Sequence, residues 1–144
     1  HYGQLLSIFS AVDLQDLYFK LKNHSDITDD IFLGLVTSSN TAYILQVQNR
    51  AAFIAFGDVH LADDDKKEKL MKIMLDKYGI KPTADRDTNE LGFLRMMKQM
   101  NLGLTLASSN SFNYLTPTSA SLFDTWTKKE YNPATNNINT SNCN

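Results

Sequence analysis

The fold is decided by residues 32–61, which read FLGLVTSSNTAYILQVQNRAAFIAFGDVHL. This stretch is the densest run of strand-favouring residues in the chain, and two short polar breaks interrupt it. Within residues 42–48, apolar side chains alternate with Gln46 and Gln48, the period of a half-buried strand. Residues 51–60 follow the break at Asn49-Arg50, and their first part, 51–56, is apolar at both alternating sets of positions. The pattern therefore predicts a covered strand over 51–60 that pairs with 42–48 as a hairpin.

Two further segments extend this predicted sheet. Residues 31–37 form an apolar run before a small polar cluster at 38–41, which favours a third strand, although a short buried helix would show the same run. Residues 16–22 alternate Leu17, Phe19 and Leu21 with more polar positions, the pattern of a strand with one solvated side. We therefore expect an antiparallel sheet of three to four strands.

Helical periodicity predicts helices over residues 2–12, 64–78 and 88–100. In 64–78 the acids come first, lysines fill the body, and Gly79 and Pro82 supply the stop. Residues 102–107 and 112–115 can form a second hairpin or lie as a loop over the core, and Pro117 favours a short C-terminal helix after them. A run of strands followed by a run of helices indicates an α+β fold.

The 144 residues are expected to form one domain over 1–131, followed by a polar tail over 132–144 whose only large apolar residue is Ile138. Lys+Arg total 14 against 16 for Asp+Glu, which disfavours a nucleic-acid or membrane-surface binder that works by bulk charge. The single cysteine, Cys143, excludes a disulfide framework within the chain. No apolar run reaches the ~18 residues of a membrane span.

The chain begins at His1 and not at methionine. We therefore expect a removed upstream segment, such as the signal peptide of an exported or periplasmic protein, or the remnant of a tag. The sequence leaves the compartment and the oligomeric state open.

The strongest candidate for chemistry is the run Gly57-Asp58-Val59-His60, followed by three aspartates that begin at Asp63. On a strand, Asp58 and His60 would point to the same side, and Asp63 could complete a site for a divalent metal. The four residues resemble the GD-x-H core of metallophosphoesterases, which implies a small metal-dependent hydrolase. The chain departs from that pattern, since Leu61 replaces the expected glycine and no upstream Asp-x-His occurs. The alternative interpretation is that the aspartates cap a helix.

Two binding surfaces are also indicated. Four aromatic residues near the C-terminus could form a recognition patch or cover the sheet: Phe112, Tyr114, Trp126 and Tyr131. Five methionines at helical spacing could line a pocket for a small apolar ligand or belong to the core: Met71, Met74, Met96, Met97 and Met100.

The sequence contains neither a Gly-x-Ser-x-Gly elbow nor a glycine-rich phosphate loop. We therefore expect a non-enzymatic protein-interaction module without a cofactor, such as an inhibitor, immunity-type protein, chaperone or adaptor, with a protein partner. The alternatives are a metal-dependent hydrolase that uses Asp58, His60 and nearby aspartates, and a carrier of a small apolar ligand.

Overall fold

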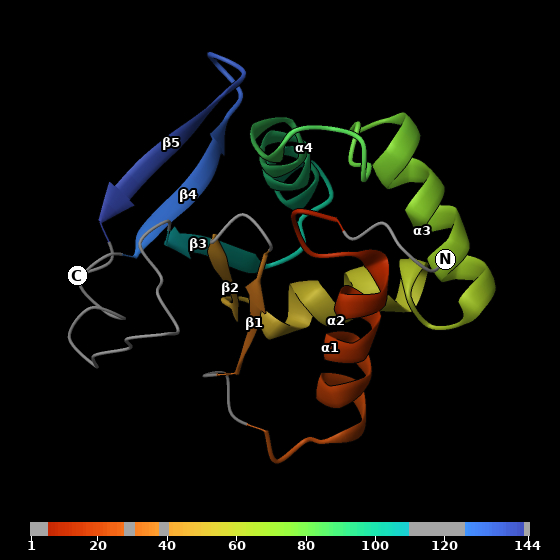
Figure 1. The fold of residues 1–144 in the computed structure, drawn as a ribbon. Coiled ribbons are helices and arrows are strands. Elements are labelled where there is room, and N and C mark those ends of the chain that lie inside the picture. Colours follow the sequence, from red (N-terminus) through yellow and green to blue (C-terminus); the bar gives the residue numbers. More distant parts are fainter. Residues whose placement is uncertain (1–5, 28–30, 38–40, 110–125, 143–144) are drawn as a thin grey trace.

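The computed structural model describes residues 6–27, 31–37, 41–109 and 126–142. These residues form four helices and five strands (Figure 1). In chain order they are α1 (Ala11–Asn23), β1 (Phe32–Val36), β2 (Ala42–Val47), α2 (Arg50–His60), α3 (Asp64–Asp76), α4 (Arg86–Gln99), β3 (Leu104–Ser109), β4 (Thr127–Asn132) and β5 (Asn137–Asn142). The predicted α+β class is confirmed, with five strands in place of three to four.

The strands lie in the order β1-β2-β3-β4-β5, and every neighbouring pair is antiparallel. The chain leaves the sheet after β2, forms α2, α3 and α4, and returns as β3 beside β2. Leu45 on β2 stands opposite Leu33 of β1 on one side and Leu106 of β3 on the other. One set of alternating side chains on β2 and β3 is therefore buried in the core.

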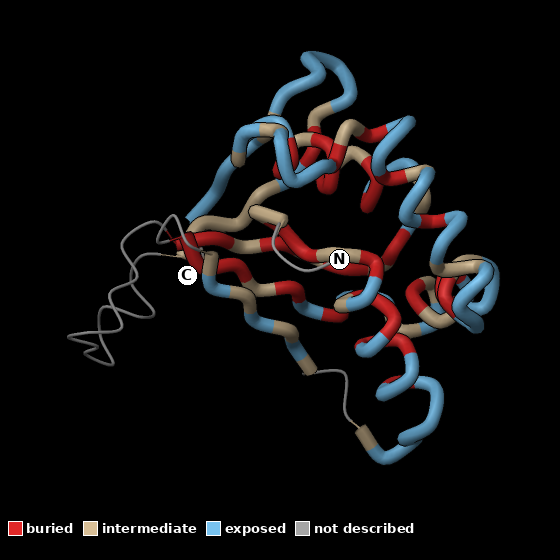
Figure 2. Tube along the Cα trace, turned by 45° about the vertical axis from the view of Figure 1, so that its right-hand side comes forward, coloured by how far each residue is buried: buried red, intermediate tan, exposed pale blue. Residues whose placement is uncertain are grey.

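The core fills the space between this face of the sheet and the helices (Figure 2). Phe9 contacts the rings of both Tyr43 on β2 and Phe93 on α4, at centroid distances of 6.5 and 6.1 Å. The aromatic side chains thus join the segment before α1, the sheet and α4 in one cluster.

The predicted strand over 51–60 is wrong, because these residues form α2. Its buried positions Phe53, Phe56 and Gly57 recur at intervals of three and four residues. The polar break before it is a helix start, since the Asn49 side chain accepts a hydrogen bond from the backbone N–H of Ala52 at 3.0 Å. In a run that is apolar at nearly every position, alternation does not distinguish a strand from a buried helix.

The predicted strand over 16–22 and the predicted helix over 2–12 are also corrected. Residues 11–23 form α1, and the side chains of Ser10 and Asp13 make its capping box. Residues 6–10 precede that cap and are not helical, although Ile8 and Phe9 are buried, and residues 1–5 lie outside the described part. The predicted helix thus placed its centre before the true start.

The strands over 31–37 and 42–48 and the helices over 64–78 and 88–100 are confirmed as β1, β2, α3 and α4. The cap of α4 is Asp85, which accepts a hydrogen bond from the N–H of Thr88 at 2.7 Å. Residues 104–109 form β3, whose neighbours are β2 and β4. The hairpin partner predicted at 112–115 and the helix predicted after Pro117 lie outside the described residues.

The segment expected to be a polar tail contains β5. Its strand pairs with β4 along its whole length, and Ile138 stands opposite Tyr131. Asn136, in the turn before β5, adopts a positive φ of 53°, a conformation that asparagine tolerates better than most residues. Backbone pairing to β4 orders a sequence whose side chains are almost all polar.

Candidate functional site

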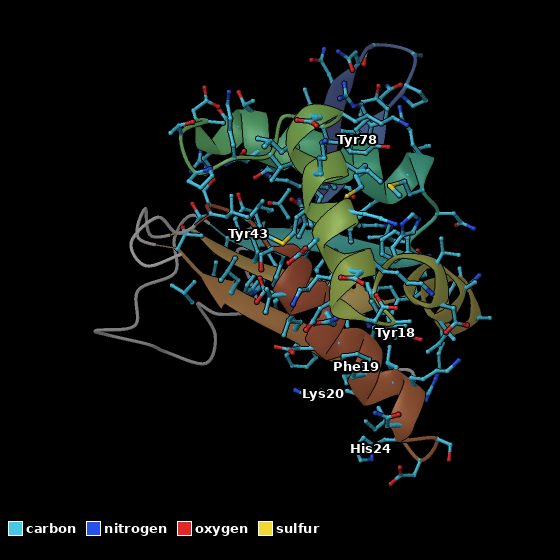
Figure 3. All side chains as sticks on the ribbon, turned by 90° about the vertical axis from the view of Figure 1, so that its right-hand side faces the viewer. Tyr18, Phe19, Lys20, His24, Tyr43 and Tyr78 are labelled. Carbon is cyan, nitrogen blue, oxygen red and sulfur yellow. The ribbon has the colours of Figure 1, made fainter. Side chains whose placement is uncertain are left out.

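The Gly57-Asp58-Val59-His60 motif lies on α2 and serves the contact between α2 and α1. The Asp58 carboxylate accepts hydrogen bonds from the Tyr18 hydroxyl at 2.5 Å and from the Lys22 ammonium at 2.9 Å. A Cβ atom at Gly57 would overlap the ring of Tyr18, so this glycine lets α1 approach α2 closely. Figure 3 shows Tyr18 on the side of α1 that meets the neighbouring helices.

These contacts change the acidity of both partners. The hydrogen bonds from Tyr18 and Lys22 hold the pKa of Asp58 below its usual value. Burial, followed by the hydrogen bond to Asp58, raises the pKa of Tyr18 to about 12. A neutral tyrosine and a lysine thus donate to the same oxygen, Oδ1, of an ionised carboxylate, a charge-assisted arrangement that holds α1 and α2 together.

His60 and Asp63, the other two predicted metal ligands, have separate roles. The His60 ring packs on Phe56 at a centroid distance of 4.9 Å, and burial lowers the pKa of His60. Asp63 caps α3 by accepting a hydrogen bond from the N–H of Lys66 at 2.8 Å. Because residues 58 and 60 are helical, their side chains diverge by about 200° around the axis. The described residues contain no group of three His, Cys, Asp or Glu side chains placed to hold a metal.

A buried polar network that was not predicted from the sequence connects α4 to two strands. Glu90 on α4 is only 2% exposed and accepts a hydrogen bond from the Tyr43 hydroxyl on β2 at 2.6 Å. Its other carboxylate oxygen pairs with the Lys129 ammonium on β4 at 2.5 Å. Burial and the neighbouring carboxylate raise the pKa of Tyr43 well above its usual value.

One sequence signal for this network existed. Glu90 occurs at helical spacing with Phe93 and Met97 on the apolar face of α4, where a charge requires a partner. The partners are 47 and 39 residues away, which is too far for local patterns to identify them. Because both carboxylate oxygens are engaged and shielded, the network anchors elements together and presents no accessible acid or base to a substrate.

Only two residues of the predicted aromatic patch, Trp126 and Tyr131, belong to the described part of the chain. Tyr131 is 8% exposed, belongs to the core, and donates its hydroxyl proton to the Asn136 side chain at 2.9 Å. Trp126 precedes β4 and is half-buried. Phe112 and Tyr114 lie outside the described part of the chain. Of the methionines, Met74, Met96 and Met97 are buried among core side chains, while Met71 is half-exposed.

The feature most open to a partner is the outer edge of β1, a strand paired only with β2 within the described residues (Figure 1). The Ile31 carbonyl accepts from the N–H of Val47, and the N–H of Thr37 donates to the Thr41 carbonyl. In an antiparallel pair, the backbone N–H and C=O groups of successive residues point alternately toward the partner strand and away from it. The backbone groups of Phe32, Gly34 and Val36 therefore point away from β2.

The side chains at this edge are apolar and exposed. Phe32 is 64% exposed and Val36 is 49% exposed. Figure 2 shows β1 as alternating exposed and intermediate positions along one border of the sheet. We call the outward backbone of Phe32, Gly34 and Val36, together with the side chains of Phe32 and Val36, the β1 edge.

Comparison with known proteins gives no match to this chain among family models, curated proteins or solved structures. In the part of the chain that the structure describes, none of the helices has the length and apolar character needed to cross a bilayer.

Proposed function

We propose that this protein is a non-enzymatic protein-interaction module that binds an extended segment of a protein partner along the β1 edge. The partner would add a strand to the sheet, with backbone hydrogen bonds to Phe32, Gly34 and Val36. The observation that carries the proposal is the wholly apolar strand FLGLV at the border of the sheet, whose outward backbone groups pair with no other strand in the described part of the chain.

The lack of protection at this edge supports the proposal. Proteins commonly shield edge strands with charged residues, proline or a bulge, because an unprotected edge pairs with other chains. β1 contains neither charge nor proline, and its register with β2 is regular over all five residues. The opposite border of the sheet is β5, whose sequence NINTSN is almost entirely polar. The two edges thus differ in a way that favours β1 as the contact surface.

The location of the conspicuous acids and bases also supports a binding role. Glu90 is buried and fully partnered, and Asp58 is engaged by Tyr18 and Lys22. The partners of these carboxylates lie on α1, β2 and β4, so both acids serve contacts between elements of the fold. The β1 edge can bind a partner through backbone hydrogen bonds and apolar contacts.

The test is co-purification from the native source with wild type, Val36→Lys and the control Gln46→Lys. Gln46 is exposed on the neighbouring strand β2, opposite Phe32, so the control adds the same charge one strand inside the open edge and leaves the outward backbone of β1 unchanged. We expect a protein that is retained by wild type and Gln46→Lys and lost by Val36→Lys. Calorimetry with the purified partner then measures the affinity of each variant. A partner retained equally by all three chains contradicts strand addition at β1.

A further inference from the structure

We infer that the partner at the β1 edge is a second copy of this chain. Two β1 strands would pair antiparallel about a two-fold axis through Gly34 and join the two sheets into one. This inference rests on the proposed function, because it names the partner of the same surface.

The sequence of β1 is self-complementary. Around Gly34, Leu33 matches Leu35, and the apolar Phe32 matches the apolar Val36. A two-fold axis through Gly34 sets Phe32 opposite Val36 of the second copy and Leu33 opposite its Leu35. An isologous interface requires this kind of symmetry, because the same patch serves both sides. An unrelated partner would place no such demand on the order of residues in β1.

The hydrogen-bond pattern fits the same axis. The outward backbone N–H and C=O groups belong to residues 32, 34 and 36. They can form hydrogen bonds between two copies only in a register that sets an outward residue of one copy opposite an outward residue of the other. The axis through Gly34 achieves this and overlaps the full length of both strands. Three hydrogen-bonded residue pairs result, with about six backbone hydrogen bonds, since each pair exchanges two.

Nothing among the described residues requires a glycine at position 34. Its φ is not in the positive region, and a Cβ added there would find no atom of the described structure within 4 Å. Glycine in a strand interior weakens the strand and often marks a close approach by another backbone. In the paired arrangement, the missing side chain leaves room for the Phe32 ring of the second copy, which lies diagonally across from Gly34.

Charge also permits self-association. Since β1 carries no ionisable side chain, two copies bring no like charges together at the axis. Exposed apolar surface on Phe32 and Val36 of both copies would be removed from water at once.

The first experiment tests the axis directly, with Gly34→Cys in a Cys143→Ser background. In a hydrogen-bonded antiparallel pair the Cα atoms lie about 5.5 Å apart, within the usual disulfide range of about 4.4–6.8 Å. We expect a disulfide-linked dimer under mild oxidation that reductant dissolves. The control Gln46→Cys in the same background is exposed on the next strand and should remain uncrosslinked. Equal crosslinking of the two variants overturns the proposed axis.

The second experiment measures oligomeric state and register by sedimentation velocity with the full chain. Wild type should be a dimer. A variant with Phe32→Lys and Val36→Lys, and a variant with Phe32→Glu and Val36→Glu, should each be monomeric, because like charges would face each other across the axis. Mixing the two should restore a dimer, since position 32 of one chain faces position 36 of the other. Circular dichroism verifies that each variant is folded.

A wild-type chain that stays monomeric at all concentrations overturns self-pairing, as does a dimer that persists in the lysine variant. Neither result decides the co-purification experiment, in which a different protein can still depend on Val36. Failure of the self-pairing inference and failure of the proposed function are thus distinguishable.

Discussion

Gly57 illustrates, at the scale of a single residue, why the conspicuous motif in α2 is structural. Gly57→Ala should destabilise the protein by about 1–3 kcal/mol, because the new methyl group would overlap the Tyr18 ring. This loss would occur although alanine is intrinsically favoured over glycine in a helix by about 1 kcal/mol. Urea denaturation gives the free energy of unfolding. In the double variant with Tyr18→Leu, we expect less destabilisation than the sum of the single changes, whereas strict additivity would contradict the proposed overlap.

His60 should make the stability of the protein depend on pH. Its pKa is lowered by burial, so between the folded and unfolded pKa values the unfolded chain binds more protons. The stability that neutral His60 provides is therefore complete above about pH 6.5, the ordinary histidine value, and is lost as pH falls through the folded pKa. Urea midpoints measured between about pH 7.5 and pH 5 should fall in the wild type. The decrease should be smaller in His60→Gln, and an unchanged pH dependence would argue against burial of the ring.

The Glu90 network shows how charged side chains hold whole elements in place, since it connects α4 to β2 and β4. Lys129→Met removes the cation and leaves a buried carboxylate with only the Tyr43 hydroxyl, which should cost about 3 kcal/mol. Adding Glu90→Gln removes the uncompensated charge and keeps an oxygen that can accept from Tyr43. The double variant should therefore be more stable than Lys129→Met alone in chemical denaturation. The reverse order would show that Glu90 is not held as a buried anion.

Local patterns identified β1, β2, α3 and α4, and they gave the wrong structure for residues of α1 and α2. The acids, lysines and terminal glycine around α3 identified that helix, and alternation with Gln46 identified β2. α2 is apolar at most positions, so its sequence fits both the period of a strand and that of a helix. The hydrogen bond from the Ala52 N–H to the Asn49 side chain marks the start of the helix. The candidate site was predictable only in part. Residues 31–37 were identified as a strand, but their place at the border of the sheet depends on strand pairings that local patterns do not encode.

At the scale of the whole molecule, the sheet has one apolar border and one polar border, and the two should respond differently to truncation. Deleting residues 137–144 removes β5 and uncovers the side of β4 that carries Tyr131, which stands opposite Ile138. Uncovering one large apolar side chain costs about 1.5–3 kcal/mol, so the midpoint of thermal unfolding should fall clearly. If residues 132–144 were instead an unordered polar tail after a domain over 1–131, the midpoint would stay unchanged. Because β1 lies at the far end of the sheet, the truncated chain should keep the association behaviour of the full chain in sedimentation velocity. Loss of both stability and association would indicate that β5 supports the entire sheet, including the β1 edge.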